Sequence, residues 1–246
     1  MKILLCGWGG HMGHEVRDCA ERAAGCEIVA GVDPMIPPQD VCVSAFQDLK
    51  TDADVIIDFS HHAMTGVMLD YAEEKGLPVV LATTGQTDEE KARIRQASEK
   101  IPIFLAANYS LGIAALTDLV KRAAVLYPDA EIEIIEQHHD RKIDAPSGTA
   151  LMLARSAADG SPSQKEFQCA RAGKNVPRQP KEIGIHAVRG GTVVGEHSVL
   201  FLGNNEVIEL RHSAQSKSVF AVGAIRAARF LASCAPGKYD MNDLLG

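Results

Sequence analysis

The spacing of hydrophobic and polar positions changes once along the chain. From residue 2 to residue 106, short apolar runs of strand length alternate with segments of helical period. Such alternation predicts a parallel, doubly wound sheet, in which right-handed crossovers place helices on both faces. The strands are expected at 2–6, 27–32, 55–59, 79–82 and 103–106, and the helices at 12–24, 64–75 and 88–100.

After about Tyr109 the pattern becomes richer in strands. Segments that alternate apolar and charged residues, as half-exposed strands do, are separated by two glycine-containing turns at 190–191 and 203–205. We therefore predict a second domain of α+β type with mostly antiparallel strands, and we expect the polar stretch 161–180 to be a mobile loop. In chain order, the elements are a helix at 111–127, strands at 130–136, 183–187, 192–202 and 206–212, and a helix at 219–231.

Length and charge narrow the class of protein. The 246 residues suffice for one large domain or two modest ones, and the formal net charge of −7 argues against nucleic acid as the main partner. No apolar stretch is long enough to span a membrane, and the N-terminal apolar run is too short for a signal peptide. The six scattered cysteines form no Cys-x-x-Cys pair. We therefore expect a cytoplasmic protein without a bound metal.

A glycine-rich segment, Gly7 to Gly13, joins the first strand to the first helix. Glycines there permit a tight turn and let backbone N–H groups approach a pyrophosphate at the positive end of the helix dipole. The spacing is G-x-G-G-x-x-G, with the last glycine one place late, so a turn without a ligand is the alternative. Asp33, after the second strand, is placed to bond the adenosine ribose, or it only begins the Asp33-Pro34 turn.

The most informative segment is Glu136 to Ala150, which reads EQHHDRKIDAPSGTA. Two adjacent histidines are followed by Arg141 and Lys142, and then by a turn that leads into an apolar helical run. Histidine titrates near neutrality and suits proton transfer, and a helix N-terminus attracts anions. The segment therefore predicts a site that binds a carboxylate and protonates a neighbouring atom. The alternative is a solvated loop in which Ser147 and Thr149 are only helix caps.

The glycine-rich segment Gly7 to Gly13 and the segment Glu136 to Ala150 resemble signatures of one family. This family is the dihydrodipicolinate reductases, or 4-hydroxy-tetrahydrodipicolinate reductases, of bacterial lysine and diaminopimelate synthesis. The resemblance extends from Lys2 to about Leu231. Further motifs similar to those of the family occur in the family's order: Asp58-Phe59-Ser60, Thr83-Thr84-Gly85, Ala106-Ala107-Asn108-Tyr109-Ser110, Val188-Arg189-Gly190-Gly191, Gly195-Glu196-His197, Phe220-Ala221 and Gly223-Ala224.

The resemblance implies reduction of 4-hydroxy-tetrahydrodipicolinate (dihydrodipicolinate), a small dicarboxylate, to tetrahydrodipicolinate with NADH or NADPH. His138 would be the proton donor or acceptor at the reacting ring, and Lys142 a second proton donor and a carboxylate partner. Substrate contacts are implied for His139, Gly148 and Thr149. Cofactor contacts are implied for Gly7, Trp8, Gly9, Gly10, His11 and Met12 at the pyrophosphate, Asp33 at the ribose, and Ala82, Thr83, Thr84, Ala106, Ala107, Asn108 and Tyr109 beside the nicotinamide.

The same resemblance implies the domain organisation. Residues 1–109 and 217–246 would form a dinucleotide-binding Rossmann domain closed by the C-terminal helix. Residues 110–216 would form a substrate-binding and oligomerisation domain with a mixed or antiparallel sheet, through which the chain assembles a homotetramer.

Four positions depart from the family pattern. Many members have arginine directly after the ribose-binding acid and inside the glycine loop, where this chain has Pro34 and His11. Ala82 replaces a frequent glycine, and Ser216-Lys217 replaces a serine-arginine pair. Because the first two changes remove cations that would meet a 2′-phosphate, we expect NADH to serve at least as well as NADPH.

Two other functions are compatible with such a scaffold, because a fold does not fix a function. One is another nicotinamide enzyme, such as an amino-acid dehydrogenase, and the other is a nucleotide sensor without activity. The full signature from His138 to Ala150 argues against the first, and the presence of both His138 and Lys142 argues against the second.

Overall fold

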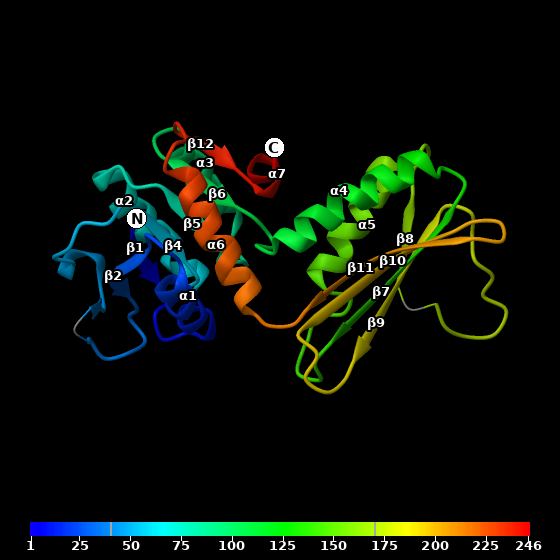
Figure 1. Ribbon diagram of the computed structural model, residues 1–246, viewed down its shortest axis with the longest axis horizontal. Helices are drawn as coiled ribbons and strands as arrows, with labels where there is room; N and C mark the ends of the chain where they lie inside the picture. The colour runs from blue at the N-terminus through cyan, green and yellow to red at the C-terminus, as the bar shows by residue number, and fades with distance from the viewer. Residues whose placement is uncertain (40, 170) are drawn as a thin grey trace. The chain divides into compact units, whose positions relative to one another are not determined.

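The computed structural model describes residues 1–39, 41–169 and 171–246, and the chain divides into two compact units. Unit 1 contains residues 1–110 and 217–246, and unit 2 contains residues 111–216. In Figure 1 the chain runs from the blue strands of unit 1 through the green, yellow and orange elements of unit 2 to the red end of unit 1. Among the helices of the described ranges, none is long and apolar enough to cross a membrane.

Unit 1 is built on a seven-stranded parallel sheet. Its central strands are apolar runs buried on both faces, as strands of a sheet covered by helices on both sides must be. In spatial order the strands are β12 (Gly237–Tyr239), β6 (Pro102–Leu105), β5 (Val79–Leu81), β4 (Val55–Asp58), β1 (Lys2–Cys6), β2 (Glu27–Val32) and β3 (Cys42–Val43).

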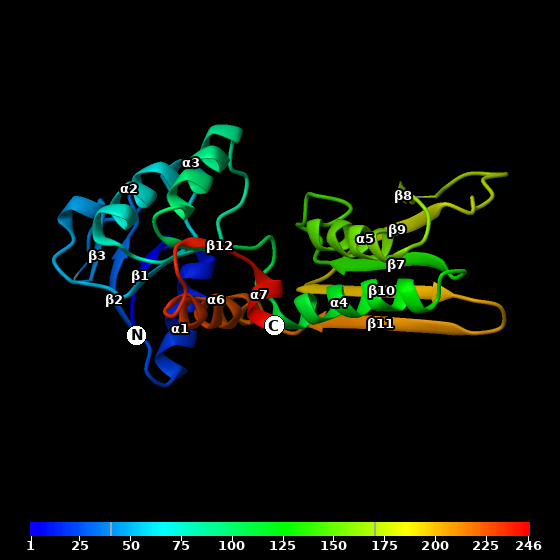
Figure 2. The same cartoon turned by 90° about the horizontal axis from the view of Figure 1, so that it is seen from above.

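Helices cover both faces of this sheet (Figure 2). α1 packs against α6 on one face, and α2 and α3 pack together on the other. Local signals set their ends: Thr87 Oγ1 accepts the Glu90 N–H in a capping box at the start of α3, and α2 ends at Gly76 with φ 66°. The helices are α1 (His11–Arg22), α2 (Thr65–Lys75), α3 (Asp88–Ser98), α6 (Ser218–Leu231) and α7 (Met241–Leu245), with short 3-10 helices η1 (Phe46–Asp48) and η2 (His62–Met64).

Unit 2 is a five-stranded mixed sheet with two helices on one face (Figure 1). The two helices, α4 (Leu111–Leu126) and α5 (Gly148–Gly160), pack against each other. β7 and β8 both run parallel to β9, and β10 is antiparallel to β7 and β11. In spatial order the strands are β11 (Val207–Ala214), β10 (Gly195–Leu202), β7 (Glu131–His138), β9 (Glu182–Arg189) and β8 (Glu166–Cys169).

Strand alternation decides which side chains of unit 2 lie beneath the helices. Every second residue points to the helix-covered face, where the apolar ones form the core with α4 and α5. The core residues of these strands are Ile132, Ile134, Ile183, Ile185, Val199 and Phe201. The same alternation continues past the core to Glu136, His138, Arg189 and His197. The helix-covered face therefore changes from apolar to polar at the carboxyl end of β7.

The predicted fold class is confirmed: a doubly wound parallel sheet is combined with a second, mixed sheet. The expectation of mostly antiparallel strands is wrong for β7 and β9, because α5 and β8 lie between them in the chain and form a crossover. The stretch 161–180 contains β8, and Ala170 within it lies outside the described residues. The pattern also misses the short strands β3 and β12, the short helix α7 and the 3-10 helices η1 and η2.

Several boundaries differ from the expected ones by a few residues. β7 extends to His138 rather than ending at Glu136, and β10 begins at Gly195 rather than at 192. The first difference matters for function, because it places His138 inside the sheet register.

Candidate active site

The glycine loop lies at the carboxyl edge of the unit 1 sheet, where doubly wound folds bind ligands. Gly7 follows β1 with φ 87°, a conformation that side chains rarely allow. A Cβ at Gly7 would lie 2.5 Å from the carbonyl oxygen of Phe59, which follows β4. A Cβ at Gly13 of α1 would lie 2.2 Å from the Gly7 carbonyl oxygen. Both glycines are therefore required by close backbone approach.

Asp33 follows β2 and is nearly buried. Its Oδ2 accepts the N–H of Gly9 at 2.8 Å, and its Oδ1 accepts the N–H of Met35 at 2.9 Å. The carboxylate thus ties the end of β2 to the glycine loop and also begins the turn that continues through Pro34. Each oxygen keeps a further lone pair for a ribose hydroxyl.

A cavity of about 510 Å³ opens beside this loop within unit 1. Its wall combines the backbone of Gly9 with the Asp33 carboxylate and with the apolar side chains of Met35, Ile36 and Met64. Among the described residues that line it, none is Lys or Arg. The cavity has the size and the mixture of apolar wall and few polar groups that are typical of small-molecule sites.

Two of the predicted cofactor residues have side chains that pack inside unit 1. The Trp8 ring lies so close to Gly31 that a Cβ there would approach a ring carbon to 2.3 Å, and Arg17 Cζ lies 4.4 Å from the ring centroid. The Tyr109 hydroxyl donates to the carbonyls of Leu81 and Phe104, and burial raises its pKa. At both positions, the main chain is the part that a cofactor would meet.

The remaining predicted cofactor residues follow strands that end at this same edge. Thr83 follows β5, and its Oγ1 donates to the Ser60 carbonyl at 3.1 Å, which links two neighbouring loops. Asn108 follows β6 and its Oδ1 accepts the Ser110 N–H at 2.8 Å. Ala82, Thr84, Ala106 and Ala107 lie in these two loops, and His11 and Met12 begin α1.

In unit 2 the polar cluster is centred on Glu136, which is fully buried. Arg189, on the neighbouring strand β9, donates from Nη1 to Oε2 at 2.8 Å and from Nη2 to Oε1 at 2.7 Å. The Ser147 N–H donates to Oε1 at 2.9 Å. Burial raises the pKa of Glu136, but the hydrogen bonds from Arg189, His138 and Ser147 outweigh burial, so this pKa lies below its usual range. The buried carboxylate is therefore charged and paired.

His138 is the last residue of β7, and its Nδ1 lies 2.6 Å from Glu136 Oε2. Burial lowers the pKa of His138 and Glu136 raises it, with a net lowering to which the positive charges of Lys142 and Arg189 contribute. A Cβ at Gly195 would lie 3.0 Å from His138 Nε2, so glycine leaves that side of the ring unobstructed. The ring therefore presents Nε2 as its second, chemically available nitrogen.

His197 of β10 packs edge-on against His138, with ring centroids 5.2 Å apart. Its Nε2 lies 3.2 Å from Ser147 Oγ, and its Nδ1 has no hydrogen-bond partner among the described residues. Burial and the nearby His138 lower the pKa of His197 to about 4, so His197 is neutral at neutral pH.

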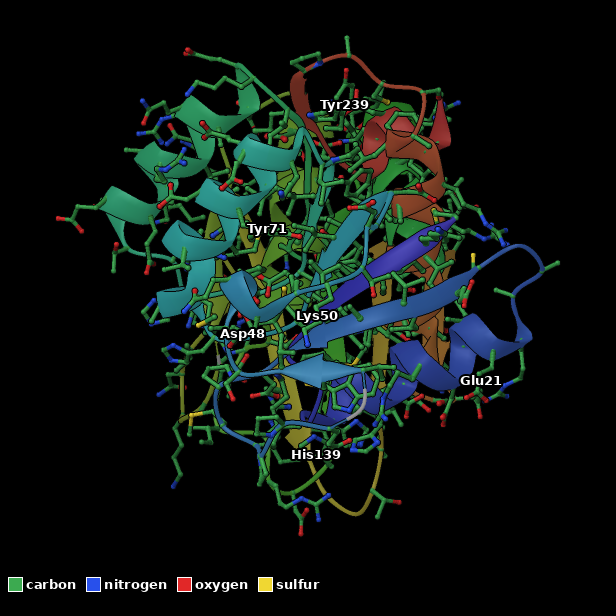
Figure 3. All side chains as sticks on the ribbon, turned by 90° about the vertical axis from the view of Figure 1, so that its left-hand side faces the viewer. Glu21, Asp48, Lys50, Tyr71, His139 and Tyr239 are labelled. Atoms are coloured by element: carbon green, nitrogen blue, oxygen red, sulfur yellow. The ribbon has the colours of Figure 1, made fainter. Side chains whose placement is uncertain are left out.

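The turn after β7 brings the other predicted substrate residues to this cluster. Ser147 caps α5 by accepting the Ala150 N–H on Oγ, so Gly148 and Thr149 form the amino end of that helix. Lys142 Nζ lies 2.7 Å from Asp144 Oδ1. His139, labelled in Figure 3, donates its backbone N–H to the Val193 carbonyl. Lys142 and the positive amino end of α5 thus lie in the segment that directly follows His138.

Sequence reasoning singled out His138 but assigned no role to Glu136, Arg189 or His197. All three occur in quoted motifs, yet only the strand register pairs His138 with Arg189 and Glu136 with His197. Sequence reasoning also missed the apolar wall of the unit 1 cavity, because Met35 and Ile36 lie in a loop without periodicity and Met64 ends the short 3-10 helix η2. Across residues 1–39, 41–169 and 171–246, no group of three or more His, Cys, Asp or Glu side chains is arranged to hold a metal ion.

Two family models match the chain. The model described as "Dihydrodipicolinate reductase, N-terminus" matches residues 1–109, and "Dihydrodipicolinate reductase, C-terminus" matches residues 112–245. The 4-hydroxy-tetrahydrodipicolinate reductase of Caldanaerobacter subterraneus subsp. tengcongensis is 48% identical over 246 residues, which cover 100% of this chain and 98% of the relative. The enzyme of the same name from Clostridium tetani is 41% identical over 249 residues, which cover 100% of this chain and 97% of the relative.

A solved structure has a similar fold. It is the dipicolinate-bound dihydrodipicolinate reductase from Paenisporosarcina sp. TG-14, with a TM-score of 0.82, 24% sequence identity and coverage of 98% of each chain.

Proposed function

The chain belongs to the dihydrodipicolinate reductase family, and we propose that it reduces 4-hydroxy-tetrahydrodipicolinate to tetrahydrodipicolinate in diaminopimelate and lysine biosynthesis. The observation that carries this proposal is the cluster in unit 2, in which a histidine held by a buried carboxylate lies beside Lys142 and a helix amino end. The reaction adds a hydride and a proton and releases the 4-hydroxyl group as water, so it requires an acid. A bound nicotinamide cofactor supplies the hydride.

His138 is the acid of this reaction. Its Nδ1 is engaged by Glu136, so the proton that it gives or takes is the one on Nε2. Histidine suits this task because its protonation changes near neutral pH. Lys142 is a second proton donor, and its charge also holds a substrate carboxylate.

The two substrate carboxylates need cations and N–H donors. Lys142, which bonds Asp144 at 2.7 Å, would exchange that partner for a substrate carboxylate. Gly148 and Thr149 form the amino end of α5, where the helix dipole favours an anion, and His139 lies in the same loop. These are the substrate contacts that we propose.

The residues of unit 1 fit a dinucleotide. Gly7 to Met12 would hold the pyrophosphate, Asp33 the ribose, and the loops at Ala82–Thr84 and Ala106–Tyr109 the nicotinamide side. The fit is supported by the backbone approach at Gly7, which leaves no room for a side chain, and by the adjoining cavity. Unit 1 is therefore the proposed cofactor-binding unit, and unit 2 the substrate-binding and oligomerisation unit.

We also propose that NADH serves at least as well as NADPH. Among the described residues of the cavity wall, Asp33 is the single member of the set Asp, Glu, Lys and Arg. The neutral Pro34 follows it in the chain. Arg17 is stacked on Trp8 and does not line this cavity. A 2′-phosphate, with about two negative charges, would therefore meet a carboxylate rather than a cation.

The same proposal includes assembly of the chain into a homotetramer and a cytoplasmic location. The face of the unit 2 sheet opposite α4 and α5 carries Val188 and Val207, which are 48% and 59% exposed, and is the proposed contact surface of a homotetramer. All six cysteines lie among the described residues and are free thiols, which supports a reducing, cytoplasmic location.

A turnover assay tests the function. The purified protein is mixed with 4-hydroxy-tetrahydrodipicolinate and NADH or NADPH, and the absorbance of the reduced nicotinamide is followed. We expect substrate-dependent oxidation of at least one cofactor, inhibited by pyridine-2,6-dicarboxylate. Absence of turnover with both cofactors would overturn the proposal.

A further inference from the structure

One carboxylate, Glu136, connects the two parts of the unit 2 site. It bonds the His138 ring through Oε2 and the Ser147 N–H, at the start of the anion-binding turn, through Oε1. We propose that Glu136 is a positioning residue that fixes the tautomer of His138 and the place of the turn 144–149 together. The proposal rests on the function proposed above for its effect on turnover, but not for the tautomer.

The tautomer follows from the partners of Glu136. A charged carboxylate only accepts hydrogen bonds, and Glu136 is held charged by the two-pronged bond from Arg189. The group 2.6 Å from Oε2 must therefore be a donor, which places a proton on His138 Nδ1. In the neutral ring Nε2 is then bare, and in the charged ring it carries the transferable proton. This assignment comes from the hydrogen-bond network.

Glu136 and Arg189 also hold the turn in place. Arg189 Nη2 also donates to the Asp144 carbonyl at 2.6 Å, so the same Arg–Glu pair fixes both ends of the segment 144–147. Ser147 then caps α5, and its Oγ lies beside His197. A change at Glu136 therefore alters the orientation of the acid and the position of Gly148 and Thr149 together.

The sign of the pH effect follows from the charges that face His138. These are the charges of Glu136 on its own strand, Arg189 on β9 and Lys142 in the following loop, whereas His197 on β10 also faces the ring but is neutral at neutral pH. Glu136 raises the pKa of His138, while burial, Lys142 and Arg189 lower it. Loss of the Glu136 charge lowers this pKa further. In the wild type, kcat falls with rising pH as His138 loses its proton. Without the Glu136 charge, this fall in kcat occurs at lower pH.

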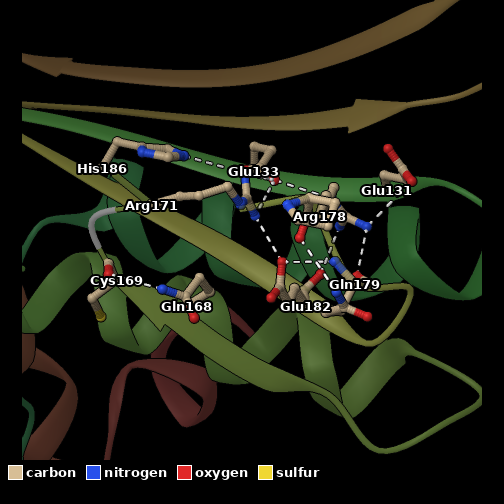
Figure 4. A network of polar contacts seen from close by, with 10 residues as sticks. Glu131, Glu133, Gln168, Cys169, Arg171, Arg178, Gln179, Glu182 and His186 are labelled. Atoms are coloured by element: carbon tan, nitrogen blue, oxygen red, sulfur yellow. Dashed lines mark hydrogen bonds and ion pairs between the residues drawn. The ribbon is translucent and has the colours of Figure 1, made fainter. Parts of the chain in front are cut away.

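The same strand offers a matched control. Glu133 is also a nearly buried glutamate, and its Oε2 lies 2.7 Å from His186 Nε2 while its Oε1 accepts from Arg178 Nε at 3.1 Å (Figure 4). Burial raises the pKa of Glu133, but its bonds to His186 and Arg178 produce a net lowering, as at Glu136. The two residues therefore share their chemistry, but Glu133 lies on the sheet face away from His138.

The experiment compares Glu136→Gln with Glu133→Gln in the full-length protein. ¹⁵N NMR of the imidazoles should show wild-type neutral His138 protonated at Nδ1, and Glu136→Gln should shift it toward the Nε2–H form. Glu136→Gln should lower kcat by about 10²–10⁴-fold, the range for a disabled acid. It should also move the pH profile to lower pH and weaken pyridine-2,6-dicarboxylate binding. Glu133→Gln should leave the tautomer, the pH profile and dicarboxylate binding unchanged.

Two results would overturn the inference. One is a wild-type His138 that is neutral with its proton on Nε2, a measurement that remains decisive if Glu136→Gln does not fold. The other is a folded Glu136→Gln protein with the wild-type tautomer, pH profile and dicarboxylate affinity. If the wild type has the assigned tautomer but turns over neither cofactor, the proposed function fails and the positioning role stands.

Discussion

Gly7→Ala tests whether the glycine loop is held by backbone contact. First, alanine would have to adopt the left-handed backbone conformation of Gly7, with φ 87°. Second, its Cβ would lie 2.5 Å from the Phe59 carbonyl oxygen. The first effect costs about 1–2 kcal/mol and the overlap about 1–3 kcal/mol more, so we expect a loss of about 2–5 kcal/mol in unfolding free energy. Gly10→Ala is the control, because Gly10 has φ −71° and its Cβ would lie 3.4 Å from the nearest atom, the Gly7 carbonyl oxygen. At this helix N-cap we expect a loss below about 1 kcal/mol.

The assay is urea unfolding followed by tryptophan fluorescence. The chain has a single tryptophan, Trp8, which is 7% exposed and lies in unit 1, so its emission reports on that unit. Since Gly7 and Phe59 both line the cavity, Gly7→Ala should also weaken NADH binding at least tenfold, equivalent to about 1.4 kcal/mol. The reasoning is refuted if the unfolding free energies of Gly7→Ala and Gly10→Ala agree within about 0.5 kcal/mol, because surface substitutions without strain differ by that amount.

His138→Gln should lower kcat by about 10²–10⁴-fold with little change in NADH affinity, and a kcat near that of wild type would remove His138 from the chemistry. Lys142→Ala should lower kcat, raise KM and weaken pyridine-2,6-dicarboxylate binding at least about tenfold, and titration calorimetry that gives equal affinities would contradict the carboxylate contact. At neutral pH, kcat/KM for NADH should equal or exceed that for NADPH. Pro34→Arg should move this ratio toward NADPH by about tenfold, and a strong NADPH preference in the wild type would end this explanation.

The fold was largely predictable because unit 1 repeats one local pattern. Apolar strand runs and helical periods locate β1, β2, β4, β5 and β6 within a residue or two. The short strands β3 and β12 have no such signal, since two or three residues become a strand only by pairing with a long neighbour. The direction of β9 was also hidden, because the alternation of side chains is the same in parallel and antiparallel strands.

The candidate site was predictable only where the chemistry is continuous in sequence. His138, His139, Lys142, Gly148 and Thr149 lie within one segment. Their roles remain predictions, and the variants above test those of His138 and Lys142. The partnership of Glu136 with Arg189 joins residues on different strands and depends on the register of β7 with β9. No spacing rule along the chain could supply it.

The division of unit 1 has a consequence for synthesis on the ribosome. Unit 2 is one continuous segment, 111–216, whereas unit 1 needs residues 217–246 for α6, which packs against α1, β4, β5 and β6, and for β12, which pairs with β6. During synthesis, unit 2 can therefore fold before all the residues of unit 1 have been made. Until α6 emerges, the part of the sheet that α6 covers and the edge of β6 stay open. Exposed apolar surface and an unpaired strand edge make an incomplete chain prone to aggregate.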